Sequence, residues 1–215
     1  MWQTITRLGE AQLLLPAFAA MLCWLAAWLR ARRNAVVWLA AVGAAALLTT
    51  VSKLAFIGWG LGYAPWDFTG ISGHAMFAAA VLPLLMSAAF AAASPRGRAL
   101  AILCGYLLAG LIAWSRVEVQ AHSVSECWTG WLLGSLASAL ALHFAPPPAG
   151  RRAPLLLSGL LAAGLLVGVA EAPPSRTHDA VTALSLWLSG RTEPYTRELL
   201  HRPGAMRSTT TIGTR

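Results

Sequence analysis

The sequence predicts an all-α protein: a polytopic membrane bundle of about six transmembrane helices in residues 1–170, followed by a polar tail in residues 171–215. Two observations point to this class. Of the 215 residues, 57% are hydrophobic and only 11% are charged, whereas a soluble domain carries roughly 25% charged residues. The apolar residues, mostly leucine and alanine, also form long runs, and about 20 apolar residues in a helix cross a bilayer. The remaining length excludes a substantial water-soluble domain.

Six apolar runs are expected to cross the membrane. They cover residues 12–29, 35–59, 71–93, 99–114, 127–144 and 154–170. The stronger basic cluster, Arg30, Arg32 and Arg33, follows the first run. Because a cleaved signal peptide carries its positive charge ahead of the apolar stretch, we expect the first run to be retained as a span.

The loops between these runs alternate in charge. Basic clusters follow the first, third and fifth runs, at residues 30–33, 96–98 and 151–152, and none of these loops contains Asp or Glu. Alternate loops share one side of the membrane, and short basic loops favour the cytoplasm. We therefore expect both termini and the loops after the second and fourth runs on the outer face. The net charge of +8 is then a topology signal, and no nucleic-acid partner is implied.

The tail in residues 171–215 is rich in Pro, Arg, Glu and Thr. Its one moderately apolar stretch, residues 180–188, is too short to span a bilayer. We interpret this stretch as a possible interfacial helix followed by a mobile segment. His178 and His201 are expected at the surface, and Asp67 is expected to be a hydrated loop acid.

Ionisable residues gather at the outer ends of the spans, where they are functional candidates because charge is costly in or beside a membrane. The candidates are Lys53, Ser72, His74, Arg116, His122 and Glu126. Arg and Lys bind phosphate, and two histidines allow one to attack while the other protonates the leaving oxygen. The i, i+4 spacing of His122 and Glu126 stacks the carboxylate beneath the imidazole on a helix, where it can fix the ring tautomer.

Two motifs resemble those of the type 2 phosphatidic acid phosphatase superfamily. Ile71-Ser72-Gly73-His74 resembles the family's Pro-Ser-Gly-His motif, with Ile in place of Pro. Ser115-Arg116, five residues, His122, three residues and Glu126 resembles its Ser-Arg-x5-His-x3-Asp motif, with the spacing kept and Glu in place of Asp. The family's Lys-x6-Arg-Pro motif is represented by Lys53 alone, because Gly60-Leu61 stands where Arg-Pro is expected.

The resemblance implies a role for each of these residues. It makes His122 the nucleophile, His74 the general acid and Glu126 the acid that orients the nucleophile. The residues that it places around the phosphate are Lys53, Ser72, Gly73 and Arg116. The implied reaction uses no metal and no cofactor.

The function expected from this resemblance is that of an integral membrane phosphatase. It would hydrolyse a lipid phosphate or diphosphate at the periplasmic face of a bacterial inner membrane, through a phosphohistidine intermediate. Its partners would be the bilayer and a phosphorylated membrane lipid. Neither the identity of the lipid nor the oligomeric state can be read from the sequence.

Other interpretations remain open at the level of sequence. A non-catalytic membrane protein or transporter could hold an anionic lipid headgroup with the same cations. Lys53 could simply extend to the membrane interface, and Glu126 could be an acid favoured at a helix N-terminus. Ligation of haem by two histidines is a poorer alternative, because Arg116 and Glu126 make the surroundings charged.

Overall fold

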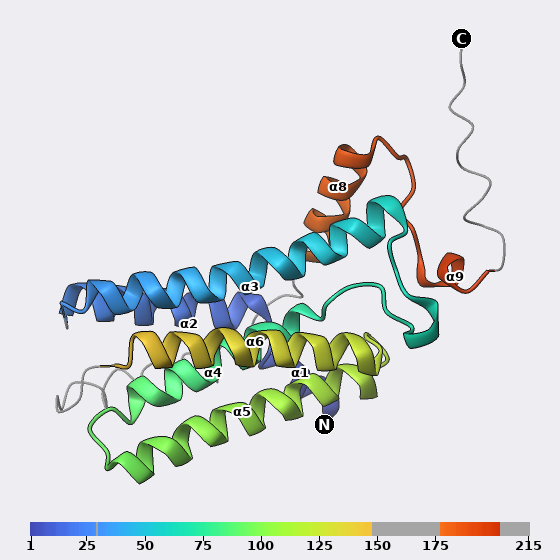
Figure 1. Cartoon of the computed structure of the whole chain (residues 1–215). Coiled ribbons are helices and arrows are strands. Elements are labelled where there is room, and N and C mark those ends of the chain that lie inside the picture. Colours follow the sequence, from blue (N-terminus) through green and yellow to red (C-terminus); the bar gives the residue numbers. More distant parts are fainter. Residues whose placement is uncertain (29, 148–176, 203–215) are drawn as a thin grey trace.

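The computed structural model describes residues 1–28, 30–147 and 177–202. In this part of the chain every regular element is a helix, as Figure 1 shows. The elements are α1 (Trp2–Arg7), α2 (Ala11–Cys23), the π-helical turn η1 (Trp24–Trp28), α3 (Arg32–Trp59), the 3-10 turn η2 (Ala64–Trp66), α4 (Gly73–Ala89), α5 (Pro95–Glu118), α6 (Val124–Phe144), α8 (Thr177–Ser189) and α9 (Arg197–Leu200). The predicted all-α class is confirmed.

Among the described residues, three helices are long and apolar enough to cross a bilayer: α3, α5 and α6. They correspond to the second, fourth and fifth predicted spans. The first and third predicted spans correspond to shorter apolar helices, Ala11–Ala27 and α4. The sixth predicted span, residues 154–170, lies outside the described residues, so the count of six stays a prediction.

The centre of the bundle is α4, which packs against α2, α3, α5 and α6. All of α4 lies within the described range 30–147, and none of its residues is exposed. Small residues permit this close packing, because a Cβ added at Gly105 of α5 or Gly130 of α6 would overlap the α4 backbone. Helices in membranes commonly approach through such small residues.

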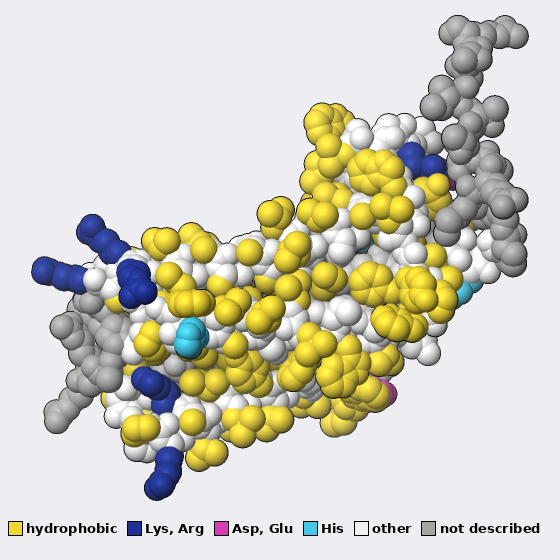
Figure 2. All heavy atoms as spheres, viewed as in Figure 1, with side chains coloured by type: hydrophobic (Ala, Val, Ile, Leu, Met, Phe, Trp, Pro, Cys, Tyr) yellow, Lys and Arg dark blue, Asp and Glu magenta, His cyan; other side chains and the backbone are white. Residues whose placement is uncertain are grey.

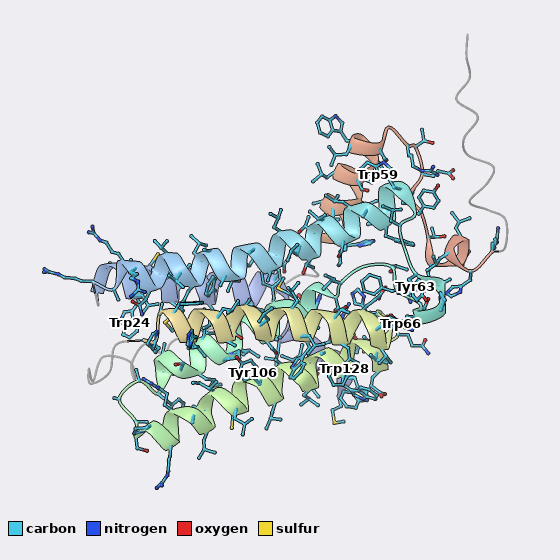
Figure 3. The ribbon with its side chains drawn as sticks, in the orientation of Figure 1. Trp24, Trp59, Tyr63, Trp66, Tyr106 and Trp128 are labelled. Carbon is cyan, nitrogen blue, oxygen red and sulfur yellow. The ribbon has the colours of Figure 1, made fainter. Side chains whose placement is uncertain are left out.

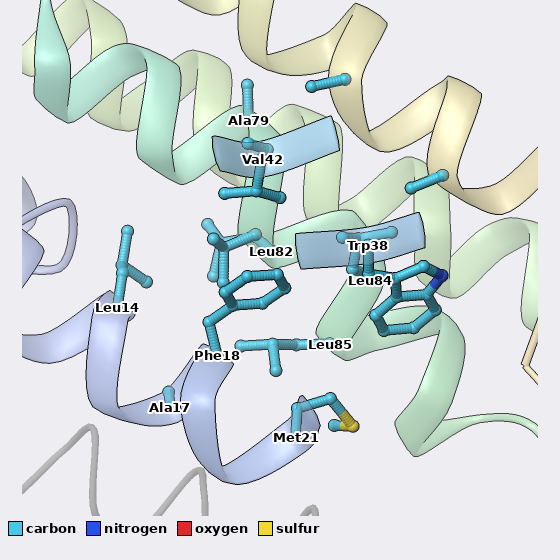
Figure 4. Packing of buried hydrophobic residues seen from close by; sticks show 14 of the residues in the cluster. Leu14, Ala17, Phe18, Met21, Trp38, Val42, Ala79, Leu82, Leu84 and Leu85 are labelled. Carbon is cyan, nitrogen blue, oxygen red and sulfur yellow. The ribbon is translucent and has the colours of Figure 1, made fainter. Parts of the chain in front are cut away.

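The main hydrophobic core joins α2, α3 and α4 (Figure 4). Phe18 and Met21 of α2 pack with Trp38 of α3 and with Leu84 of α4, all fully or almost fully buried. The indole Nε1–H of Trp38 donates to the carbonyl of Ala145, 2.9 Å away. This hydrogen bond satisfies a buried donor and ties α3 to the end of α6.

The two ends of the bundle differ in their side chains. One end, called the basic end below, holds the starts of α3 and α5 with Arg32, Arg33, Arg96 and Arg98. Figure 2 shows Lys and Arg side chains gathered there, while apolar side chains cover the long side of the bundle. Figure 3 shows Trp59, Tyr63, Trp66 and Trp128 near the opposite end. Aromatic side chains of this kind favour a membrane–water interface.

Residues 190–202, called the 190–202 segment below, were expected to belong to a mobile tail, and the structure corrects this expectation. The predicted helix at residues 180–188 is present as α8, and Ser185 of α8 donates its hydroxyl to the carbonyl of Leu54, 3.0 Å away. After α8 the chain returns to the bundle, where the backbone N–H of Tyr195 donates to the carbonyl of Ile57 at 2.9 Å. The segment thereby packs against the end of α3 that lies away from the basic end (Figure 1).

Candidate active site

A cavity of about 680 Å³ lies away from the basic end and brings together residues from distant parts of the chain. Its walls come from the junction of α1 and α2, which includes Glu10, from α3, α4 and the loop before it, from α5, the loop before α6, α8 and the 190–202 segment. Among the lining residues are Lys53, Gly73, His74, Arg116, His122 and Arg197. Five of these six were predicted from the sequence, and Arg197 was not.

His122 and Glu126 form the most defined contact of the site. The imidazole Nδ1 of His122 lies 2.7 Å from Oε2 of Glu126. Glu126 is fully buried and is surrounded by donors, so its carboxylate acts as an acceptor and His122 Nδ1–H as the donor. This assignment leaves Nε2 of His122 unprotonated when the ring is neutral, and His122 lines the cavity.

The start of α6 explains why Glu126 lies where it does. Ser123 is the N-cap, and its hydroxyl accepts from the backbone N–H of Glu126 at 3.3 Å. In return the backbone N–H of Ser123 donates to Glu126 Oε2 at 3.1 Å, which completes a capping box. The carbonyl of Glu126 also accepts from the backbone N–H of Ser72 at 3.1 Å. The starts of α4 and α6 are therefore joined at the site.

Two further groups bind the carboxylate of Glu126. The backbone N–H of Thr69 donates to Oε1 at 2.7 Å, and the Thr69 hydroxyl is also in contact with this oxygen. One guanidinium nitrogen of Arg197, Nη2, lies 3.0 Å from Oε1 and 2.9 Å from Oε2. The other, Nη1, pairs with the carboxylate of Asp67. Asp67 lies in a loop as expected and keeps a side chain that is 40% exposed, but its carboxylate is paired with Arg197.

Lys53 approaches the first turn of α4 from α3. Its side chain passes Gly70, where an added Cβ would lie 3.1 Å from Lys53 Cγ, and its Nζ lies 4.0 Å from the position of a Cβ at Gly73. Gly70 also has a φ of +144°, a conformation that L side chains rarely adopt. Gly70 therefore leaves room for Lys53, whereas a Cβ at Gly73 would make only an ordinary contact with it.

Arg116 lies in the last turn of α5, which extends further than the predicted span and makes this residue helical. Its Nη1 donates to the hydroxyl of Thr6 in α1 at 3.0 Å. Its Nε is buried and has no hydrogen-bond partner among the described residues. The short helix α1 was not predicted, since residues 2–7 carry no long apolar run.

The two remaining predicted residues occupy different environments. His74 lines the cavity from the first turn of α4. Ser72 is the N-cap of α4, but its side chain is fully buried, makes no capping hydrogen bond and is not part of the cavity wall. The structure thus brings six of the seven predicted residues to the cavity or to the buried pair beside it, and it places the hydroxyl of Ser72 behind the wall.

The electrostatic environment favours the neutral form of His122. Burial lowers the pKa of the His122 imidazole below its ordinary value. The hydrogen bond to Glu126 opposes this shift, and the positive charges of Lys53 and Arg116 add to it. Neutral imidazole is the form that can attack an electrophile.

The arrangement is suited to binding and transferring a phosphoryl group. Lys53 and Arg116 supply positive charge around one cavity, which is also lined by the imidazoles of His74, His122 and His178. Within residues 1–28, 30–147 and 177–202, no group of three or more His, Cys, Asp or Glu side chains could hold a metal ion.

Comparisons with known proteins agree with the two motifs. The PAP2 superfamily profile matches residues 56–148, which contain His74, Arg116, His122 and Glu126. An uncharacterized 22.5 kDa protein in the cps region of Klebsiella pneumoniae is 40% identical over 141 residues, or 66% of this chain and 68% of that protein. No solved structure matches the chain.

Proposed function

The chain belongs to the PAP2 superfamily, and on this premise we propose that it is a metal-independent phosphatase of a membrane lipid phosphate or diphosphate. The observation that carries the proposal is the His122–Glu126 pair at a cavity lined by cations. A carboxylate that holds one imidazole nitrogen leaves the other free to attack phosphorus.

In the proposed first step, Nε2 of His122 attacks the phosphorus atom. A P–N bond forms, the P–O bond to the lipid breaks, and His74 in its protonated form gives its proton to the leaving oxygen. In the second step water attacks the phosphorus atom and His74 accepts a proton from that water. A new P–O bond forms, the P–N bond breaks with its electron pair returning to Nε2 of His122, and phosphate leaves. Glu126 stabilises the positive charge that develops on His122.

Lys53, Arg116 and the backbone at Gly73 would bind the phosphate oxygens in both steps. Cations placed where negative charge develops stabilise the transition state. The buried Nε of Arg116, which has no partner among the described residues, is a donor suited to this task. The hydroxyl of Ser72 lies outside the cavity wall and its backbone N–H donates to the Glu126 carbonyl, so its proposed contribution is to join the start of α4 to that of α6 and not to bind the phosphate directly.

The shape of the cavity supports a lipid as the substrate. Along α3 its wall extends from Lys53 to Ala46, a separation of seven residues or about 10 Å on a helix. Phe77 of α4 also lines it. Thr49 and Thr50 line the stretch between Lys53 and Ala46. A phosphate bound at Lys53 would therefore have a mixed surface on the membrane side, where the chain of a lipid could lie against Ala46 and Phe77.

The cavity would open on the periplasmic side of a bacterial inner membrane. This proposal follows from the basic end at the opposite side of the bundle, which the positive-inside rule assigns to the cytoplasm. A cysteine at exposed Gln120, in a background without native cysteines, should react with an impermeant thiol reagent added outside intact cells. Labelling only after the membrane is opened would place the cavity in the cytoplasm instead.

Phosphate release from defined lipids tests the proposed reaction. The purified protein in detergent would be supplied separately with undecaprenyl diphosphate, phosphatidic acid, phosphatidylglycerol phosphate and a lipid A phosphate. We expect release from at least one, and loss of both release and acid-labile phosphoryl labelling in His122→Ala. His178→Ala is the matched control, since His178 lines the cavity from α8 but has no proposed role. Lipid binding without release would favour the headgroup-binding alternative.

A further inference from the structure

Arg197 is the residue of the 190–202 segment that reaches the candidate pair most directly. It lies at the start of α9, where Thr196 is the N-cap. Its Nη2 contacts both carboxylate oxygens of Glu126, at 3.0 and 2.9 Å. Its Nη1 contacts the carboxylate of Asp67 and also donates to the Asp67 carbonyl at 3.0 Å. One guanidinium thus joins the carboxylate of Asp67, which follows η2, to that of Glu126 in the first turn of α6.

Arg197 differs from the other hydrogen-bond partners of Glu126 in the charge that it carries. Thr69 and Ser123 donate from backbone N–H groups and His122 donates from an imidazole, whereas Arg197 carries a permanent positive charge. The Glu126 side chain is fully shielded from solvent. A buried carboxylate needs such compensation to remain ionised.

The segment is held in place by contacts other than those of Arg197. His201 Nε2 lies 2.7 Å from Oδ1 of Asp67, and the backbone of Tyr195 donates to Ile57. Asp67 therefore contacts two side chains of the segment, those of Arg197 and His201. These contacts would keep the segment in position when Arg197 alone is changed.

We propose that Arg197 is a positioning residue for the His122–Glu126 pair. Its guanidinium holds the Glu126 carboxylate in the orientation in which Oε2 accepts from His122 Nδ1, and it limits how strongly that carboxylate attracts a proton to the imidazole. The nitrogens that make these contacts are committed to carboxylates, so Arg197 acts on the pair and not on the phosphate. The inference rests on the proposed phosphatase function.

Several charged groups face His122, and their balance predicts the effect of removing Arg197. The carboxylate of Glu126 on α6 contacts the His122 imidazole. The positive charges of Lys53 on α3 and Arg116 on α5 repel a proton on this imidazole, and His122 and His74 on α4 would repel each other when both are charged. Without Arg197 the negative charge of Glu126 is less compensated, so the pKa of His122 should rise. The protonated, non-nucleophilic ring would then persist to higher pH.

Three variants test this inference: Arg197→Gln, Arg197→Lys and the control Arg202→Gln, which removes an exposed arginine from the same segment. Two measurements would be made in detergent, the rate of lipid phosphate hydrolysis across pH and the titration of the His122 imidazole by NMR. For Arg197→Gln we expect kcat to fall by about 10²-fold, because small misplacements of a catalytic pair have effects of this size. KM should change much less, and the acid limb of the pH profile should move to higher pH.

The other two proteins define the specificity of the effect. Arg197→Lys should recover part of kcat and of the pH profile, since it restores the charge without the fork, and Arg202→Gln should resemble the wild type. If Arg197→Gln kept the wild-type kcat and the wild-type His122 titration, the positioning role would be wrong while the phosphatase function stood. If the wild type released no phosphate, the proposed function would fail, and the NMR titration alone would still decide whether Arg197 acts on His122.

Discussion

Substitution of Gly130 by alanine tests how the packing of α6 against α4 positions the site. An added Cβ at Gly130 would lie 2.5 Å from the carbonyl oxygen of Ser72 and 3.1 Å from Cβ of Ala75. Ordinary contacts begin at 3.4 Å. The two helices must therefore separate by about 0.9 Å at the turn that carries His74.

The expected effect of this separation is large for both stability and rate. Overpacking of this kind costs about 1–3 kcal/mol, and a displacement of about 1 Å in a catalytic site can reduce the rate by about 10²-fold. The matched control is Gly43→Ala in α3, where an added Cβ meets nothing within 4 Å. This control measures the gain in helix propensity alone, which is up to about 1 kcal/mol in soluble helices.

The assay compares thermal unfolding in detergent and initial rates of lipid phosphate hydrolysis for the two variants and the wild type. Gly130→Ala should unfold at a lower temperature than Gly43→Ala and should lose at least tenfold in rate. If the two variants unfolded together and were equally active, the close contact between α4 and α6 would not position the site. A loss of stability with an unchanged rate would show that the shift does not reach His74.

Three further predictions concern the chemistry of the site. Glu126→Gln should lower turnover by roughly 10² to 10⁴-fold, because the amide has no charge and can hold the wrong tautomer of His122; Glu126→Asp should lose less, and near-normal rates for Gln would reduce Glu126 to a helix-capping acid. Burial lowers the pKa of His122, whose neutral form attacks, so kcat/KM should begin to fall only when the pH drops below the ordinary histidine pKa of 6.5. A decrease of kcat/KM centred above pH 6.5 would contradict the predicted direction of the pKa shift. Activity should survive EDTA, because cationic side chains take the place of metal ions; loss on chelation that Mg²⁺ or Zn²⁺ restores would refute the histidine mechanism.

The positions of the helices could largely be predicted because long apolar runs leave a strong signal. The predicted span 35–59 corresponds to α3, Arg32–Trp59, and the span 127–144 corresponds to α6, Val124–Phe144. The differences of a few residues arise at the ends, where caps such as Ser123 decide the start of a helix and polar residues can continue it. The contact of His122 with Glu126 was expected from i, i+4 spacing on a helix, but His122 lies one residue before Ser123, the N-cap of α6. The contact is present, and the capping box at Ser123 brings the two side chains together in place of a helical turn.

Contacts between distant segments left no comparable signal. Arg197 reaches Asp67 and Glu126 across 130 and 71 residues of sequence, and the tail that carries it is polar and lacks periodicity. The hydrogen bond from Arg116 to Thr6 joins residues 110 positions apart. Such pairs depend on how loops are placed by the finished bundle, so neither composition nor spacing identifies them.

The enclosure of α4 affects how the protein responds to bilayers of different thickness. With 17 residues, α4 is about 25 Å long, less than the roughly 30 Å of a bilayer's hydrocarbon core. Hydrophobic mismatch acts on the helices that lipid touches, and it is relieved by their tilt or by deformation of the bilayer. Because α2, α3, α5 and α6 all present exposed apolar side chains while α4 presents none, changes in lipid chain length should act on those outer helices first. The depth of the start of α4 is then set by the protein around it and not by the membrane.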